Sequence, residues 1–302
     1  MTRILLTGKN GQVGWELQRT LASWGELIAM DSKELDLSDP DAIRRTVREI
    51  RPDIIINPAA YTAVDKAESE PELAMAVNGI APGILAEEAC RLGAVLVHYS
   101  TDYVFDGNKA APYSEDDVPN PQCVYGRTKL SGEQAVRAAG GKHLILRTSW
   151  VYGVHGGNFV KTVLRLARER DELRIVADQS GAPTWARDLA QATLSAIAVW
   201  QKKEWENSLS GLYHLTASGR TDWHRYAEEI VRLARKYDAT LAAKPLDIHA
   251  IATREYPTPA RRPANSALAN DKIKSAFGIA LPEWQESLAE CMRLLYEQPH
   301  AR

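Results

Sequence analysis

Two side chains suited to proton transfer, Tyr125 and Lys129, lie four residues apart in this sequence. Residues i and i+4 of a helix lie on the same face, so the phenol and the amine are expected to be neighbours. A free phenol has a pKa near ~10, and a nearby ammonium lowers that pKa. The same spacing is common on ordinary exposed helix faces, so a catalytic interpretation needs a second feature.

A glycine-rich turn near the N-terminus is that second feature. Residues 4–6 (ILL) form a short apolar run, and Gly8, Gly11 and Gly14 follow it at intervals of three. The spacing differs from the G-x-G-x-x-G fingerprint but is closely related to it. Glycines between a strand and a helix let the backbone approach a pyrophosphate, and the helix N-terminus supplies N–H donors. The turn and the tyrosine–lysine pair together predict a nicotinamide-dependent enzyme.

The residues after the second apolar run bear on the choice of cofactor. Asp31 lies twenty residues beyond Gly11, where an acidic side chain can bind ribose hydroxyls and so favours NADH. Lys33 follows two residues later and is able to meet a 2′-phosphate. We therefore expect the cofactor to be NADPH or NADH.

Short apolar runs alternate with helix-like segments in the first half of the chain, which is typical of a parallel sheet with helices on both faces. We predict an α/β fold with a doubly wound, Rossmann-like parallel sheet and a smaller C-terminal substrate lobe. Residues 1–149 are expected to bind the dinucleotide and residues 150–302 mainly the substrate, with some segments returning to pack on the first domain. The strands are expected at residues 4–6, 27–30, 54–56, 94–99, 144–146, 175–176 and 213–215.

Helices are predicted from apolar periodicity and from helix-start signals. A long polar loop, residues 106–122, exceeds an ordinary connection, so we expect it to cover a site. Pro82 should kink or split the helix that contains it. The expected helices are residues 14–23, one that begins at residues 38–41, residues 72–92, one that carries Tyr125 and Lys129, and residues 158–168, 187–200, 223–237 and 282–296.

Composition and charge restrict the class of protein. The chain has 37 Lys and Arg residues against 39 Asp and Glu residues, a net charge of −2, so no global positive field favours nucleic acid or an anionic membrane as a partner. Three cysteines without metal-type spacing fit a reducing compartment, and no apolar stretch is long enough to span a membrane. We expect a cytoplasmic protein.

Four motifs occur in an order that resembles the extended short-chain dehydrogenase/reductases: the glycine turn, residues 100–105 (STDYVF), the Tyr-x-x-x-Lys pair and residues 147–152 (RTSWVY). A closer resemblance is to the dTDP-4-dehydrorhamnose reductase family, and it extends into the C-terminal lobe. The segments that carry it are residues 8–14 (GKNGQVG), 64–68 (VDKAE), 181–184 (GAPT) and 257–263 (PTPARRP).

This resemblance implies hydride transfer from NAD(P)H to C4 of dTDP-4-dehydro-6-deoxy-L-mannose (dTDP-4-dehydro-β-L-rhamnose), which gives dTDP-L-rhamnose. Tyr125 would deliver a proton to the developing oxyanion while Thr101 donates a second hydrogen bond, unless Thr101 is only a turn cap. Lys129 would lower the tyrosine pKa and bind the nicotinamide ribose. The cofactor contacts implied by glycine turn and family position are Gly8, Asn10, Gly11, Gln12, Val13, Gly14, Asp31, Asp36, Leu37, Ala60, Tyr61, Thr62, Tyr99, Tyr125 and Lys129.

Substrate contacts are expected beyond the catalytic residues. Family position points to Asp102 and Trp150, although a tryptophan after a strand is also often part of the core. A nucleotide diphosphate needs local cations and donors because the chain as a whole carries none in excess. Candidates for that role are Asn158, Lys161 and Arg261 or its neighbour Arg262.

We expect no metal ion in the site. Some relatives dimerise through an acidic cluster that holds magnesium, but Glu16, which we expect on an exposed helix face, has Arg187 where a second acid would be needed. The histidines show no close pair at metal-ligand spacing. The chain is expected to be a monomer or a homodimer.

Two rival functions share this fold. A nucleotide-sugar 4,6-dehydratase or epimerase would retain bound NAD, and the dehydratases carry glutamate where this chain has Tyr103. A non-catalytic binding protein, such as the regulatory subunit of methionine adenosyltransferase, also resembles these reductases. The joint presence of Thr101, Tyr125 and Lys129 favours an active reductase.

Overall fold

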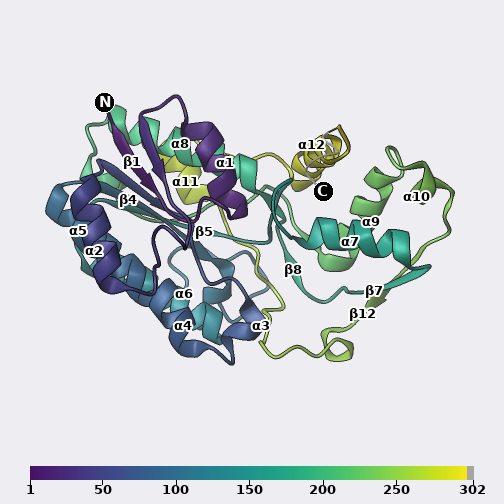
Figure 1. The fold of residues 1–302 in the computed structure, drawn as a ribbon. Coiled ribbons are helices and arrows are strands. Elements are labelled where there is room, and N and C mark those ends of the chain that lie inside the picture. Colours follow the sequence, from purple (N-terminus) through teal and green to yellow (C-terminus); the bar gives the residue numbers. More distant parts are fainter. Residues whose placement is uncertain (298–302) are drawn as a thin grey trace.

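A six-stranded sheet, in which every neighbouring pair is parallel, forms the centre of the larger lobe (Figure 1). The structure is a computed structural model that describes residues 1–297. The predicted α/β class and doubly wound sheet are confirmed; strands buried on both faces read as continuous apolar runs, which is why the sequence revealed them. In spatial order the strands are β10 (Gly211–His214), β5 (His143–Thr148), β4 (Val95–Thr101), β3 (Ile54–Asn57), β1 (Arg3–Leu6) and β2 (Glu26–Ala29).

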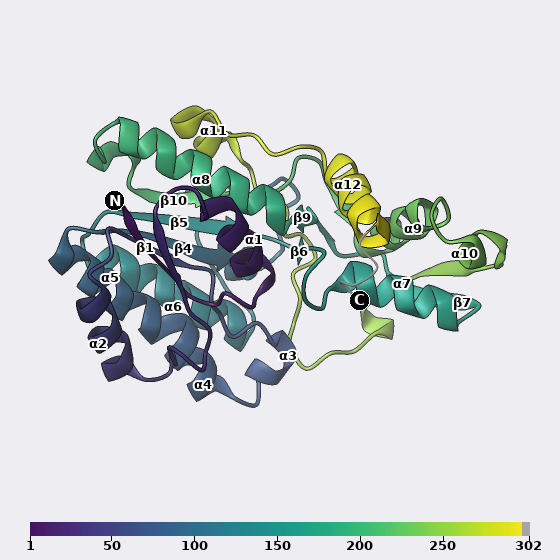
Figure 2. The same cartoon turned by 45° about the horizontal axis from the view of Figure 1, so that its top comes forward.

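Helices cover both faces of this sheet, as the two views show (Figures 1 and 2). Ile4 and Leu6 of β1 pack with α1 (Gln12–Leu21), α8 (Ala186–Lys202) and α11 (Asp271–Phe277). Leu5 points to the opposite face, because successive strand residues alternate. The helices on that second face are α2 (Pro40–Ile50), α5 (Ala81–Leu92) and α6 (Val124–Ala138).

The helix predicted over residues 72–92 is interrupted, as its proline suggested. It consists of α4 (Pro71–Met75), a π-helical segment (Ala76–Ile80) and α5, with Pro82 in the first turn of α5. Proline lacks the N–H that would continue the hydrogen bonding of the preceding turns, and the π-helical segment lies directly before it. The interruption buries Asn78, whose side-chain oxygen accepts from the Tyr61 backbone N–H at 2.8 Å. The break therefore fixes the loop that follows β3.

A smaller lobe is built mainly from residues after β5 (Figure 1). Its core lies between α7 (Phe159–Glu169), α9 (Trp223–Ala234) and α12 (Trp284–Glu297). The sequence analysis missed β12 (Asp247–Ile251), because apolar and polar side chains alternate in its residues (DIHAI) and most of them are exposed. The remaining elements are α10 (Ala239–Ala243), the parallel pairs β7 (Glu172–Val176) with β12 (Asp247–Ile251) and β6 (Val151–Tyr152) with β9 (Thr184–Trp185), and the antiparallel pair β8 (Ser180–Gly181) with β11 (Thr221–Asp222).

Part of the chain's second half returns to the larger lobe. The strand expected near residues 213–215 is β10, the edge strand of the main sheet, and it pairs with β5. Trp200 of α8 is fully buried in the core beneath the sheet. The two halves of the sequence therefore share one hydrophobic core.

The long loop of residues 106–122 contributes no residue to the lining of the cavity described below. Tyr113 is buried and stacks on Phe105, with the ring centroids 4.1 Å apart. Asn265 donates two hydrogen bonds to backbone carbonyls of the same loop. The loop thus holds the C-terminal segment around residue 265 against the larger lobe. Within residues 1–297, no helix combines the length and the apolar character needed to cross a membrane.

Candidate active site

A cavity of about 570 Å³ lies at the carboxyl ends of the parallel strands. Ligands bind there in open α/β sheets because neighbouring crossovers leave a crevice at that edge. Tyr61 is the one expected cofactor contact that does not line the cavity: its hydroxyl donates to Glu70 at 2.6 Å instead. The expected contacts that do line it are Gly8, Asn10, Gly11, Gln12, Val13, Gly14, Asp31, Asp36, Leu37, Ala60, Thr62, Tyr99, Tyr125 and Lys129.

The lining also contains residues that the sequence analysis did not name as cofactor contacts. They lie at or just after strand ends, in the π-helical segment or in the loop before α7. Three of them, Ser100, Thr148 and Val151, belong to the motifs at residues 100–105 and 147–152, and the glycine pair at 156–157 was a further local signal. The additional lining residues are Ser32, Leu35, Pro58, Ala59, Val77, Ser100, Thr148, Val151, Gly156 and Gly157.

The glycine turn fits a backbone-bound anionic group. Gly8 has φ +61°, and a Cβ there would lie 2.9 Å from Cα of Ala59. A Cβ on Gly14 would lie 2.1 Å from the carbonyl oxygen of Gly8. No side chain caps the N-terminus of α1, where Gly11 is the N-cap residue, so its first N–H groups are available to a ligand. The turn is therefore shaped as a pyrophosphate cradle requires.

Asp31 lies two residues beyond β2, at the rim of the cavity. Its carboxylate accepts from Asn10 Nδ2 at 2.8 Å and from the backbone N–H of Lys33 at 2.9 Å. The Lys33 backbone bond is the main reason that the pKa of Asp31 is lowered. An ionised acceptor thus faces the region where an adenosine ribose would lie, while the Lys33 side chain is exposed.

Helix α6 presents Tyr125 and Lys129 to the cavity, as the i, i+4 spacing predicted. Gly126 lets this helix approach closely, because a Cβ there would lie 2.2 Å from the Tyr103 carbonyl oxygen. Lys129 is only 2% exposed, and its Nζ donates to the Tyr99 carbonyl oxygen at 2.6 Å. The lysine therefore ties α6 to the end of β4.

The electrostatics of Tyr125 differ from the expectation. Burial raises its pKa, a hydrogen bond with Thr101 opposes the rise, and the Asp102 carboxylate adds to it. The lowering expected from Lys129 is not found, because the lysine is not among the groups that shift the pKa of this phenol and burial is the largest influence on it. A tyrosine with a raised pKa keeps its proton at neutral pH, which is the form that a general acid requires.

Thr101, at the end of β4, is a turn cap that also lies beside the tyrosine. Its Oγ1 accepts from the Tyr103 backbone N–H at 3.2 Å, which caps the 3₁₀ segment Asp102–Val104. The same hydroxyl donates to Asp102 Oδ1 at 2.9 Å and is hydrogen-bonded with Tyr125. Burial raises the pKa of Asp102 to about 6, against hydrogen bonds from Ser266 and Thr101. Thr101, Asp102 and Tyr125 therefore form one connected group at the sheet edge.

The candidate substrate residues lie in the smaller lobe and in its connection to the larger one. Trp150 has φ +46° and stacks on Trp223, with the ring centroids 3.5 Å apart. Asn158 caps α7 by accepting from the Lys161 backbone N–H at 3.1 Å, and its Nδ2 donates to Gln12 at 3.0 Å. Asn158 therefore joins the lobes. Partial burial lowers the pKa of Lys161.

The two neighbouring arginines differ in their environment. Arg261 is exposed and donates to Gln122 at 3.3 Å. Arg262 is half-buried, pairs with Asp65 at 2.9 Å and lies close enough to lower the pKa of Tyr103. Arg262 is thus the more buried of the two arginines that the sequence analysis left as alternatives.

Glu16 is buried rather than exposed, contrary to expectation. Burial raises its pKa, while the charges of Arg187 and Arg19 oppose the rise. Within residues 1–297, no group of three or more His, Cys, Asp or Glu side chains is arranged to hold a metal ion.

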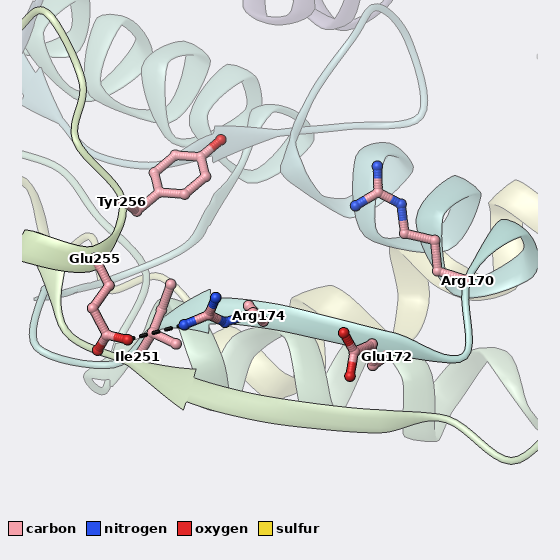
Figure 3. Close-up of a pocket in the computed structure, with 6 residues that line it drawn as sticks. All are labelled: Arg170, Glu172, Arg174, Ile251, Glu255 and Tyr256. Carbon is pink, nitrogen blue, oxygen red and sulfur yellow. Dashed lines mark hydrogen bonds and ion pairs between the residues drawn. The ribbon is translucent and has the colours of Figure 1, made fainter.

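A second hollow, of about 400 Å³, lies in the smaller lobe beside β7 and β12 (Figure 3). In Figure 3, Arg174 points toward Glu255 and forms an ion pair at 2.9 Å, while Tyr256 and Arg170 flank the open space. Five of the six residues that line this hollow are exposed, and none belongs to the tyrosine–lysine–threonine group. The cavity at the sheet edge is therefore the better candidate for the chemistry.

The doubly wound sheet, the glycine turn and the helix that carries Tyr125 and Lys129 define an extended short-chain dehydrogenase/reductase fold. A family model described as "RmlD substrate binding domain" matches residues 1–297. The dTDP-4-dehydrorhamnose reductase of Burkholderia thailandensis is 49% identical over 300 residues, which cover 98% of this chain and 100% of that one. The chain belongs to the dTDP-4-dehydrorhamnose reductase family, which confirms the resemblance seen in the sequence.

Two solved structures agree with this membership. A dTDP-4-dehydrorhamnose reductase from Clostridium acetobutylicum is 41% identical, covers 97% of this chain and 99% of its own, and has a TM-score of 0.88. The corresponding protein from Bacillus anthracis, solved in complex with NADP, is 37% identical with a TM-score of 0.86, over 97% of this chain and 99% of its own. The similarity therefore includes both lobes.

Lys129 should leave a pH signature in the stability of the protein. Burial lowers its pKa from 10.5 to about 8, against the opposing charge of Glu133. Between these pH values the unfolded chain binds one more proton at this residue than the folded chain does. The buried ammonium is therefore a penalty that is fully present below pH 8 and is relieved as the pH rises.

We predict that the parent gains about 2 kcal/mol of unfolding free energy relative to Lys129→Met between pH 7 and pH 9.5. Urea denaturation at closely spaced pH values measures this difference. Lys274→Met removes an exposed lysine of α11 and serves as the control. A difference between parent and Lys129→Met that stays constant over this range would contradict the assigned burial.

Proposed function

We propose that this chain uses NADPH or NADH to reduce the 4-keto group of dTDP-4-dehydro-6-deoxy-L-mannose (dTDP-4-dehydro-β-L-rhamnose) to dTDP-L-rhamnose. The observation that carries the proposal is the convergence of Thr101, Tyr125 and Lys129 beside the glycine turn. Membership of the dTDP-4-dehydrorhamnose reductase family supports the choice of substrate. The site is built from one chain, so the proposal applies equally to a monomer and a homodimer.

We assign cofactor binding mainly to residues 1–149 and substrate binding mainly to residues 150–302. The N-terminus of α1 and the glycine turn would hold the pyrophosphate, and Asp31 would accept from the adenosine ribose. When bound, the nicotinamide supplies the hydride that adds to C4 of the sugar. Three free cysteines support a cytoplasmic location for the enzyme.

The protein's own residues provide for the charge that grows on the sugar oxygen. Tyr125 keeps its proton until the oxyanion develops and then transfers it. The Thr101 hydroxyl, which donates to Asp102, would turn to donate to the same oxygen. Lys129 has three donor hydrogens, and the one not used within the protein can reach a ribose hydroxyl in the cavity that it lines.

The remaining substrate contacts are assigned from their positions. Trp150, stacked on Trp223, offers a flat apolar wall, and Asp102 offers an acceptor for a sugar hydroxyl. Arg262 is the preferred cation for the diphosphate, with Lys161 and Asn158 at the other side and Arg261 as the outer cation. A doubly anionic group requires such local charges in a chain of net charge −2.

The decisive assay follows the oxidation of NADPH and NADH with a panel of nucleotide 4-ketosugars. We predict that Tyr125→Phe lowers kcat about 10²–10⁴-fold while cofactor affinity is kept, because only the acidic hydroxyl is lost. Cofactor binding is measured by fluorescence titration. Turnover within twofold of the parent would refute the acid role, and NAD retained by the purified parent would favour an epimerase or dehydratase.

Cofactor preference should depend on the residues after β2. Asp31→Ala is expected to weaken NADH more than NADPH, because the variant loses a ribose hydrogen bond but also loses a charge that repels a 2′-phosphate. Lys33→Ala should have the opposite effect. Steady-state constants for both cofactors on both variants decide the matter. An unchanged preference in both would show that neither side chain contacts the ribose.

Substitution of Arg262 and, as a control, of Arg174 gives a matched comparison for substrate binding. Arg262→Ala should raise the KM for the dTDP-sugar about tenfold to a hundredfold, the value of a charge-assisted hydrogen bond. Arg174→Ala removes an ion-paired arginine of the second hollow and should change this KM less than about twofold. Equal effects of the two substitutions would argue against a diphosphate contact at Arg262.

A further inference from the structure

Behind Lys129, a chain of buried polar side chains runs across three strands of the sheet. Lys129 Nζ lies 3.4 Å from His98 Nε2, and His98 Nδ1 lies 3.1 Å from Asn57 Nδ2. Thr7 Oγ1 donates to Asn57 Oδ1 at 2.6 Å. His98 and Asn57 are 0% exposed and Thr7 is 1% exposed, so solvent cannot replace any of these contacts. Buried polar side chains destabilise a protein unless they are hydrogen-bonded, so a row of them this deep in a parallel sheet indicates a specific role.

The donors and acceptors of this chain depend on the charge of Lys129. As the side chains stand, Thr7 donates to Asn57 and Asn57 donates to His98 Nδ1, so the imidazole carries its proton on Nε2 and faces Lys129 as a donor. That arrangement suits a neutral amine. An ammonium has only donors, so it requires the other tautomer, with Nε2 accepting, and an Asn57 amide turned over to accept from Nδ1.

We propose that His98, held by Asn57 and Thr7, is a positioning residue for the reduction: it adjusts its tautomer to the charge of Lys129 and aims the remaining N–H of that lysine into the cavity. The inference rests on the proposed function. The geometry supports it, because once Nε2 accepts, His98 and the Tyr99 carbonyl oxygen together occupy two of the three donor directions of the charged lysine.

The other charged groups around Lys129 are few and fixed. Glu133 of α6 raises the pKa of Lys129, and it is itself bound by Arg147 of β5 through paired hydrogen bonds of 2.8 and 2.6 Å. Burial and the charge of Lys129 hold the pKa of His98 well below its usual value. His98 therefore stays neutral near pH 7 and acts through its tautomer. Tyr125 lies one turn before Lys129 on the same helix, and its raised pKa separates its titration from that of the lysine, while Asp31 and Asp36 line the cavity near the glycine turn.

The test compares His98→Leu with His98→Gln. Gln keeps an amide oxygen near the position of Nε2, whereas Leu offers Lys129 no acceptor. Hydrogen bonds to a charged group are the stronger ones, so losing the acceptor should lower the Lys129 pKa by about one unit. In His98→Leu we expect the basic limb of the kcat/KM profile to shift about one unit to lower pH and the KM for the cofactor to rise. In His98→Gln both values should return most of the way to those of the parent.

His214→Leu is the matched control, because His214 is an equally buried imidazole on β10 that hydrogen bonds to neither Lys129 nor Tyr125. It should leave the pH profile in place. Thr7→Val tests the far end of the row of buried polar side chains without substituting the histidine. It should shift the basic limb of the kcat/KM profile to lower pH, as His98→Leu does, but by a smaller amount. If His98→Leu does not fold, Thr7→Val and His98→Gln still decide the question.

A readout without substrate separates this inference from the proposed function. The pH at which the parent begins to gain stability over Lys129→Met should lie about one unit lower when both proteins also carry His98→Leu. An unchanged titration of Lys129 there, or a His98→Leu pH profile that superimposes on the parent's, would overturn the positioning role even if the reductase activity is found.

Discussion

A buried lysine is the constraint on which the arrangement of this site depends. The Nζ of Lys129 must find acceptors, because an ammonium without partners is very costly in a protein interior. It finds the Tyr99 carbonyl oxygen near the end of β4, just beyond the last residue that this strand pairs with β3. This bond fixes α6 in rotation and in translation against the sheet. Tyr125, one turn earlier on the same helix, is thereby placed beside Thr101.

The surroundings of the lysine form two shells with different tasks. Toward the cavity lie the Tyr125 phenol and the glycine turn, which would contact ligands, with Thr101 next to the phenol. Away from it lie groups that bind each other, including the Glu133–Arg147 pair, whose side chains are 3% and 2% exposed. Loss of one partner of such a buried ion pair strongly destabilises a protein, because the other charge is left buried and unpaired. The pair therefore restricts how α6 and β5 can move relative to each other. The chemistry of the outer groups relies on that rigidity.

The two lobes are joined by contacts at the same cavity. Gln12, in the first turn of α1, accepts from Asn158 and donates to the Val151 carbonyl oxygen, so it connects the glycine turn with the start of the smaller lobe. The ring of His155 stacks on Trp15, with the centroids 5.1 Å apart. A substrate held by the smaller lobe is therefore placed against a cofactor held by the larger one without a flexible linker between them.

The sequence by itself determined the parallel sheet, the glycine turn and the helical pairing of Tyr125 with Lys129. These are local patterns: a strand buried on both faces needs a continuous apolar run, and a turn against a phosphate needs glycine. The tertiary structure decided features that depend on distant partners. Burial, rather than the neighbouring lysine, sets the pKa of Tyr125, and Asp65 rather than local spacing orients Arg262. His98 resembles an ordinary core residue in the sequence, and only the alignment of β1, β3 and β4 places it between Asn57 and Lys129, because strand register is set by packing across the whole sheet.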